Sequence, residues 1–410
     1  MNYIGSKFSL LPDIERVLDT SRVPDSGVAL DIFAGTGVVA QLLKRRGHIA
    51  YANDWQYYSY LTCAAYLEHN ELPGFSHLLS DHYWESQIRE CPAVQRELPL
   101  CPTTGAGGPV YDASAARVLA YLSRLPGKTG AFYDAYCEGG SAGRQYFAKE
   151  NGLRIQAIRD QMENWSRDRL ISLGDRAWLV ACLLEGADRV ANTASVYGAY
   201  LKHVKQSAQK PLRLHLLVPA PSVHAAQCHR AFCADSEALL RDLEHTRLRL
   251  VYVDPPYNSR QYNANYHVLE TIARWDLDQF EPRGVTGLRG SKENRSRYCL
   301  KRQVTEGFRR LLGLMNTEYV LFSYSDEGLV SRQELERLFR DCCRTVRFEE
   351  IPYRRFRADT DGENRIYKGD STVEYLILGE MNSPTERPTA QVPSDEHAVA
   401  SVASFTGLRA

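Results

Sequence analysis

Residues 1–69 alternate short apolar runs with amphipathic stretches. Apolar residues follow a helical spacing in 8–18, which predicts a helix. The apolar run 28–34 ends in glycines, as a buried parallel strand does, and 38–46 again has helical spacing, with basic residues in its last turn. Residues 48–53 read as a second strand. This succession of strand, helix and strand predicts a doubly wound α/β sheet.

The same pattern returns in the second half of the chain. Residues 249–253 and 319–324 are apolar and predict two further strands. Ser331 and Glu334 have the spacing of a capping box and predict a helix over 333–339. Residues 347–356 and 373–378 then predict a closing antiparallel pair of strands.

Between these two regions the periodicity loosens. Residues 70–222 are rich in tyrosine and contain glycine-studded stretches, with helical spacing only in 156–165 and 176–190. We therefore expect 1–69 and 223–380 to form one α/β domain and 70–222 to form a large, mainly helical insertion. Residues 381–410 are rich in Ser, Thr, Pro and Ala, which predicts a disordered tail.

The composition is that of a globular protein. Hydrophobic residues make up 44% and charged residues 24% of the 410 residues, which excludes wholesale disorder, collagen and a coiled coil. The 50 basic and 50 acidic residues give a net charge of zero, so a uniformly basic coat is excluded, but a local basic face is not. No apolar stretch is long enough to span a membrane, and the first residues have no apolar signal core. The 10 cysteines lack zinc-site spacing, so we expect free thiols, no metal and a cytoplasmic location.

A glycine-rich turn follows the first predicted strand. Asp31 is followed by Phe33, Gly35 and Gly37, and glycines at such a turn let a ligand approach the backbone next to the N-terminus of a helix. This is not the dinucleotide fingerprint G-x-G-x-x-G, nor a P-loop, and such a turn is often only structural. Asp54 lies about 20 residues further on, where an acidic residue in nucleoside-binding folds accepts hydrogen bonds from ribose hydroxyls. An ordinary surface aspartate is the alternative.

The strongest signal is Asp254-Pro255-Pro256-Tyr257, directly after the strand 249–253. Proline has no N–H to donate to a sheet, so two prolines predict an exposed, extended turn with carbonyls free of pairing. A carboxylate and a carbonyl on such a turn can accept both hydrogens of an exocyclic amine. The tyrosine ring can stack on a planar base. A purely structural turn remains the alternative.

With these motifs the chain resembles the D12-class, alpha-group N6-adenine DNA methyltransferases of type II and IIS restriction–modification systems. The resemblance covers residues 1 to about 380. It lies in the stretches 2–7, 31–37, 195–202, 254–262 and 323–328, together with Asp54. It implies an S-adenosylmethionine-dependent methyltransferase fold, Rossmann-like, with a doubly wound, mostly parallel seven-stranded sheet. The insertion 70–222 would then be the target-recognition domain.

The resemblance also implies roles for single residues. Asp254, Pro255, Pro256 and Tyr257 would be catalytic. The cofactor S-adenosylmethionine would be bound by Tyr3, Lys7, Asp31, Phe33, Gly35, Gly37, Asp54 and Asp235, although Asp235 could equally be a helix N-cap. We expect DNA contacts from residues in or near the basic stretches and the matching motifs: Tyr197, Lys202, Lys205, Arg260, Arg289, Lys292, Arg295 and Arg297.

The predicted reaction is methylation of N6 of an adenine flipped out of double-stranded DNA. A separate cognate restriction endonuclease that acts on the same site is a further expected partner. The alternatives are an RNA adenine-N6 methyltransferase, which needs no duplex opening, and a DNA cytosine-N4 methyltransferase, which more often has Ser in place of Asp254. A protein glutamine methyltransferase, which usually has Asn there, and a non-catalytic DNA-binding regulator fit the motifs less well.

Overall fold

The computed structural model describes residues 5–89, 113–224, 228–258, 262–290, 296–354 and 371–382. They contain a seven-stranded sheet in the order β3-β2-β1-β4-β5-β7-β6. The strands are β1 (Val28–Asp31), β2 (Ile49–Asn53), β3 (Arg230–Phe232), β4 (Leu248–Val253), β5 (Thr317–Ser325), β6 (Cys343–Arg354) and β7 (Ser371–Met381). Strands β1 to β5 are parallel, whereas β7 is antiparallel to both β5 and β6. The α/β class, the mostly parallel sheet and the closing antiparallel pair are confirmed.

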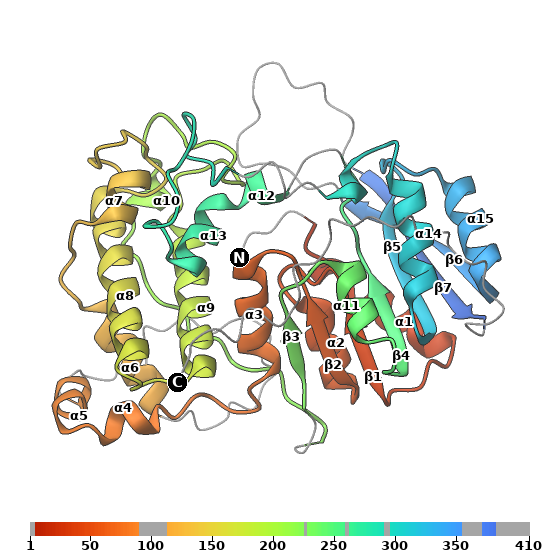
Figure 1. Ribbon diagram of the computed structural model, residues 1–410, viewed down its shortest axis with the longest axis horizontal. Helices are drawn as coiled ribbons and strands as arrows, with labels where there is room; N and C mark the ends of the chain where they lie inside the picture. Colours follow the sequence, from red (N-terminus) through yellow and green to blue (C-terminus); the bar gives the residue numbers. More distant parts are fainter. Residues whose placement is uncertain are drawn as a thin grey trace.

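Helices cover both faces of the sheet (Figure 1). One face packs against the first helices of the chain, whose apolar stripes enter the same core as β1 and β2. The other face packs against helices from the second half of the chain. The first group is η1 (Phe8–Leu10), α1 (Leu11–Thr20), α2 (Val38–Arg46) and α3 (Tyr57–Leu67), and the second is α11 (Ser236–Asp242), α14 (Val304–Leu314) and α15 (Arg332–Cys342).

The sequence patterns explain where several of these helices begin and end. Helix α2 ends at Gly47, which has φ +107° and donates its N–H to carbonyls of the last turn. Helix α15 begins with the predicted capping box, in which Ser331 and Glu334 satisfy each other's backbone N–H groups. Helix α8 (Lys149–Arg167) contains the predicted segment 156–165, and helix α9 (Leu173–Arg189) covers the predicted segment 176–190 except for its last residue.

A second body of helices lies to the left of the sheet in Figure 1, with α3 between the two. Its members are α4 (Ser76–Ser80), α5 (His82–Arg89), α6 (Ala113–Ser123), α7 (Ala131–Tyr136), α8, α9 and α10 (Gln206–Gln209). Their core also includes α3 and α13 (His267–Arg274), for example Tyr58, Ala65 and Leu269. The helical packing therefore extends past residues 70 and 222, and the division of the chain at those residues stays a prediction.

Two predictions concern the end of the chain and membranes. Strand β7 continues through Met381, and the remainder of the expected tail, 383–410, lies outside the described residues. Among the helices of the described part, none is both long and apolar enough to cross a bilayer.

Candidate active site

The candidate site lies at the carboxyl ends of β1 and β4, two adjacent parallel strands. To one side of this pair the sheet continues through β2, and to the other through β5. In open α/β sheets, ligands bind outside the carboxyl ends of the strands where the strand order reverses. Asp31 ends β1, and Asp254 directly follows β4. The fold therefore brings the two motifs of the sequence to one place.

The glycine turn after β1 needs backbone conformations that favour glycine. Gly35 has φ +52° and Gly37 has φ +72°. A Cβ atom on Gly37 would lie 3.0 Å from the Sγ atom of Cys63 in α3. The turn thus runs close to α3 and leads directly into α2, which begins at Val38.

Asp54, which follows β2, holds this turn. One carboxylate oxygen accepts the Gly35 N–H at 2.9 Å, and the other accepts the Gln56 N–H at 2.8 Å. Burial raises the pKa of Asp54 to about 6, although these hydrogen bonds favour its ionised form. The hydroxyl of Ser59 also favours the ionised form, and a carboxylate can accept about four hydrogen bonds in all.

Asp31 is a buried acid beside the turn, with 1% of its surface exposed. Among the described residues no hydrogen-bond donor reaches its Oδ1 atom. Burial, and next the charge of Asp254, raise its pKa well above the usual range. A buried carboxyl oxygen without a hydrogen-bond donor fits a cationic ligand group. Such a group would supply both the hydrogen bond and the opposite charge that favours the ionised form.

The motif 254–257 forms the expected turn at the end of β4. Asp254 is half-buried, Pro255 is buried, and Tyr257 is partly exposed. The Tyr257 carbonyl accepts the N–H of Leu329, which ties the turn to the loop between β5 and α15. The motif is therefore held at both ends by the sheet and its loops.

Lys7 joins this turn to the last strand of the sheet. Its ammonium nitrogen lies 3.1 Å from Oδ1 of Asp254 and 2.9 Å from Oε1 of Glu374 in β7. The same nitrogen lies 5.9 Å from the centre of the Tyr257 ring, within reach of a cation–π contact. Glu374 is 2% exposed and also accepts a 2.5 Å hydrogen bond from the hydroxyl of Ser323 in β5.

The electrostatics of this cluster balance burial against charge. Burial raises the pKa of Asp254 to about 7; Lys7 lowers it, and Glu374 raises it. For Lys7, burial lowers the pKa, but Asp254 and then Glu374 outweigh burial, so that the pKa is well above its usual range. A lysine that stays charged thus faces a carboxylate that is close to its titration point at neutral pH.

A family model described as D12 class N6 adenine-specific DNA methyltransferase matches residues 3–338. The chain belongs to this family. It is accordingly an adenine-specific DNA methyltransferase, which confirms the resemblance seen in the motifs. No solved structure matches the chain.

The relatives of the chain are named as type II methyltransferases or as modification methylases. The chain is 38% identical to "Type II methyltransferase M.NlaIII" of Neisseria lactamica over 382 residues, which cover 92% of the chain and 98% of the relative. It is 32% identical to "Type II methyltransferase M.FokI" of Planomicrobium okeanokoites, with 87% of the chain and 50% of the relative covered. For "Modification methylase StsI" of Streptococcus sanguinis the identity is 29%, over 90% of the chain and 51% of the relative. The chain thus spans nearly all of the first relative and about half of the other two.

Within this methyltransferase, the structure brings most of the predicted cofactor-site residues to one edge of the sheet. Phe33 is half-buried, and its ring packs edge-on against the ring of Tyr298, with the two ring centres 5.2 Å apart. Asp235 caps helix α11, because its Oδ1 atom accepts the N–H groups of Glu237 and Ala238, as the alternative interpretation expected. Tyr3 lies outside the described residues.

The predicted DNA contacts are less uniform. Tyr197 is fully buried, and its hydroxyl donates to Asp188, so we place it in the packing core and not among the candidate DNA contacts. Arg289 makes a two-pronged ion pair with Asp276, at 2.8 and 2.6 Å. Lys205 donates to a backbone carbonyl and Arg297 pairs with Glu237, whereas Lys202 is exposed. Arg260, Lys292 and Arg295 lie outside the described residues.

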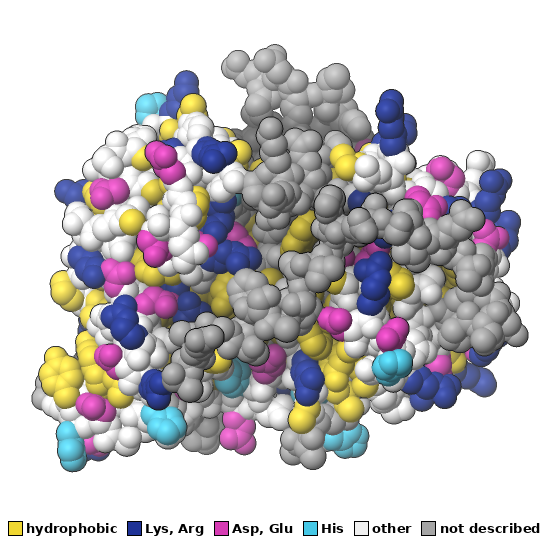
Figure 2. Space-filling model, in the orientation of Figure 1, with side chains coloured by type: hydrophobic (Ala, Val, Ile, Leu, Met, Phe, Trp, Pro, Cys, Tyr) yellow, Lys and Arg dark blue, Asp and Glu magenta, His cyan; other side chains and the backbone are white. Residues whose placement is uncertain are grey.

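The visible surface agrees with these pairings. On the face drawn in Figure 2, Lys and Arg side chains are interspersed with acidic ones, and the described residues form no uniformly basic region there.

Three buried polar residues that the motif analysis missed support the site. Glu374 contacts Lys7, as described above. The amide of Asn53 donates to the carbonyls of Ile32 and Ala234 and accepts the Ala234 N–H, so it joins the ends of β1, β2 and β3. Of these, Glu374 had a signal in the sequence: an acidic residue in phase with the buried Leu376 and Leu378 of an alternating strand.

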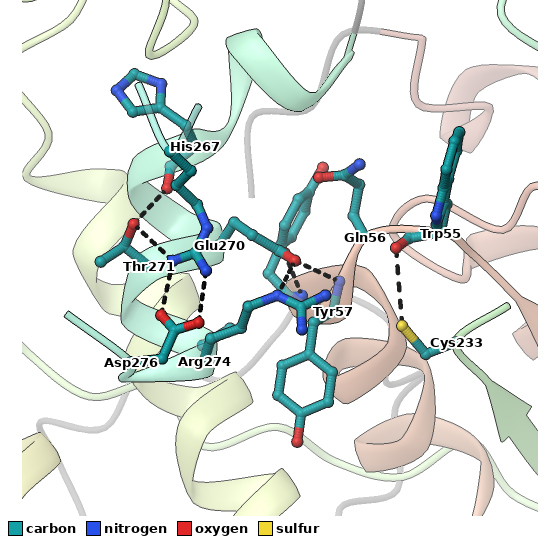
Figure 3. A network of polar contacts seen from close by, with 12 residues as sticks. Trp55, Gln56, Tyr57, Cys233, His267, Glu270, Thr271, Arg274 and Asp276 are labelled. Carbon is teal, nitrogen blue, oxygen red and sulfur yellow. Dashed lines mark hydrogen bonds and ion pairs between the residues drawn. The ribbon is translucent and has the colours of Figure 1, made fainter. Parts of the chain in front are cut away.

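The third is Glu270 in α13, at the centre of Figure 3. Its two oxygens accept the N–H groups of Tyr57 and Tyr58 at 3.1 and 3.0 Å, and Arg274 donates to it at 2.6 Å. Glu270 therefore caps the N-terminus of α3, directly after the Asp54 turn. Helix α13, which comes after the motif 254–257 in the chain, is in this way attached to the predicted cofactor side of the site.

Proposed function

We propose that this methyltransferase transfers a methyl group from S-adenosylmethionine to N6 of an adenine flipped out of double-stranded DNA. The observation that carries the proposal is the placement of Asp254 on a proline-stiffened turn at the switch point of the sheet, next to the Asp31 and glycine-turn motifs. The family and the names of its relatives support adenine as the target base and DNA as the substrate.

The residues of the glycine side fit the cofactor. Asp31 has a buried oxygen that suits an ammonium group. Gly35 and Gly37 form a turn without side chains, so a ligand can approach its backbone closely. Asp54 would accept the ribose hydroxyls with the lone pairs that its backbone contacts leave. Lys7, Tyr3, Phe33 and Asp235 complete the proposed cofactor contacts. S-adenosylmethionine, when bound, supplies the electrophilic methyl group.

Asp254 would act on the amine. The adenine N6 lone pair is conjugated into the ring, so the nitrogen is a poor nucleophile. Hydrogen bonds from N6 to the Asp254 carboxylate and to the Pro255 carbonyl would favour a more pyramidal nitrogen. They would strengthen as positive charge develops on it, which stabilises the transition state more than the ground state.

Tyr257 would hold the flipped base. Extruding a base costs a few kcal/mol, and stacking on an aromatic ring contributes about 1–3 kcal/mol in return. The ring is partly exposed, as stacking requires, and its backbone is fixed by the hydrogen bond from Leu329. Pro256 adds stiffness to the turn that carries both groups.

The proposal includes the setting of the reaction. The relatives named as type II methyltransferases support a modification enzyme of a restriction–modification system. A separate cognate endonuclease as partner and a cytoplasmic location are further parts of the proposal. Single-molecule sequencing of DNA from cells that express the protein tests it. We expect N6-methyladenine at one short sequence, and none in cells that express Asp254→Ala; methylation of cytosine, or only of RNA, would overturn it.

A further inference from the structure

Glu374 is a buried acid in the last strand of the sheet, and it lies close to the turn that carries Asp254. It lies in β7, pairs with Lys7 at 2.9 Å, and is held in place by the hydroxyl of Ser323. With 2% of its surface exposed, it is screened from water. A buried carboxylate is costly unless it is paired and hydrogen-bonded, and here both conditions are met.

We propose that Glu374 is a positioning residue for methyl transfer, which acts through Lys7 on the Asp254 carboxylate. The inference rests on the proposed role of Asp254. Lys7 contacts one oxygen of the Asp254 carboxylate and one oxygen of the Glu374 carboxylate. It therefore holds the Asp254 carboxylate through its Oδ1 atom. The second oxygen of Asp254 would then accept the amine hydrogen. Glu374 has no contact with the substrate in this arrangement.

Two effects follow from the geometry. Glu374 holds the ammonium group of Lys7 in line with the turn, and it offsets part of the lysine charge. Without this offset Lys7 would bind Asp254 alone and make its carboxylate a weaker hydrogen-bond acceptor. Because both carboxylates contact the same nitrogen, their nearest oxygens are at most about 6 Å apart, a distance at which buried charges interact strongly.

The charge of Glu374 changes the pKa of Asp254 in a direction that can be measured. Four groups face Asp254 or its partner: Lys7, Glu374, Asp31 of β1 and Tyr252 of β4. Lys7 lowers the pKa of Asp254, and Glu374 raises it. Neutralising Glu374 should therefore lower this pKa, so that the aspartate stays ionised at lower pH.

The test compares the pH dependence of kcat in Glu374→Gln and in the wild type, with tritiated methyl transfer to DNA as the readout. We expect the acid limb of kcat to move to lower pH by about one unit. At pH 8 we expect kcat to fall about tenfold, with the KM for DNA within about threefold of wild type. A merely structural role would not move the acid limb. A folded Glu374→Gln with wild-type kcat and an unmoved acid limb would overturn the proposal.

Two further variants keep the test decisive. Glu380→Gln removes an acid from the same strand that pairs with Arg344 away from the site, and it should behave as wild type. Should Glu374→Gln not fold, Ser323→Ala decides instead: it removes the hydroxyl that holds Glu374, and an unchanged kcat would overturn the inference. Asp254→Asn in the same assay separates the two proposals, because activity retained there would overturn the role of Asp254 itself.

Discussion

The ammonium group of Lys7 lies 3.1 Å from the carboxylate of Asp254, although the two residues stand in widely separated parts of the sequence. The pair joins the first motif of the chain to the motif that would hold the target amine. The family resemblance placed Lys7 among the residues that would bind the cofactor. Its position between two protein carboxylates puts it between the residues proposed to bind the cofactor and those proposed to bind the base.

Asp254→Asn should abolish methyl transfer and leave cofactor binding largely intact. The amide keeps the shape of the side chain but removes the negative charge that would stabilise the positive nitrogen of the transition state. Loss of such a contact costs about two to three orders of magnitude in kcat. Tritium incorporation into DNA measures the rate, and calorimetry with S-adenosylmethionine measures binding. Asp19→Asn, at an exposed acid of α1, is the matched control; near-wild-type turnover by Asp254→Asn would contradict the assigned role.

Lys7→Met should move the acid limb of kcat to higher pH. Asp254 already has a pKa of about 7 because burial raises it, and Lys7 is the group that opposes this rise. A carboxylate that must be ionised gives activity that is lost as pH falls through its pKa. Removing Lys7 raises that pKa, so activity should be lost at a higher pH than in wild type. A pH–rate profile under saturating DNA and cofactor checks this, and a shift to lower pH would contradict it.

Tyr257→Ala should lower kcat by about one to two orders of magnitude, whereas Tyr257→Phe should keep it within about threefold. A stacked ring contributes about 1–3 kcal/mol, and phenylalanine retains the stacking face. Fluorescence of DNA with 2-aminopurine at the target position reports base flipping directly. If the alanine variant gives the same fluorescence rise as wild type, the stacking role of Tyr257 is wrong.

Glu270→Gln should destabilise the protein by about 1–3 kcal/mol and weaken cofactor binding. The side chain satisfies two backbone N–H groups of α3 and pairs with Arg274, and loss of a charged buried acceptor has a cost of this size. Because α3 follows the Asp54 turn, we also expect the Kd for S-adenosylmethionine to rise several-fold. Urea unfolding and calorimetry measure the two effects. Glu185→Gln in α9, where the acid pairs with Arg189, serves as the comparison; equal effects from both variants would refute a special role of Glu270.

The sequence patterns predicted most of the sheet because parallel strands buried on both faces are continuous apolar runs. Residues 28–34, 249–253 and 319–324 each contain such a run, and each overlaps a strand of the structure. Strand β3 was not predicted: it has three residues, begins with Arg230 and lies at the edge of the sheet. Its pairing with β2 is a long-range contact that local periodicity does not record.

The candidate site was predictable where it consists of motifs and not where it depends on pairing partners. Asp31, Asp54 and Asp254 could be found because Asp31 ends a strand and the other two directly follow one. By contrast, the burial of Tyr197 and the ion pair of Arg289 with Asp276 depend on helices packed from distant parts of the chain. The sequence singled out Tyr197 by the motif-like stretch 195–202 and Arg289 by its basic neighbours, and neither signal records such packing.

Strand β7 lies between β5 and β6 although it is the last of the described strands in the chain, and it supplies one of the two carboxylates that hold Lys7. During synthesis on the ribosome, the gap between β5 and β6 can close only after this strand has emerged. A chain arrested before residue 371 would carry the aspartate, both prolines and the tyrosine, but not the acid that anchors the lysine. The enzyme should therefore gain its full catalytic competence late in translation, after its recognisable motifs have already been made.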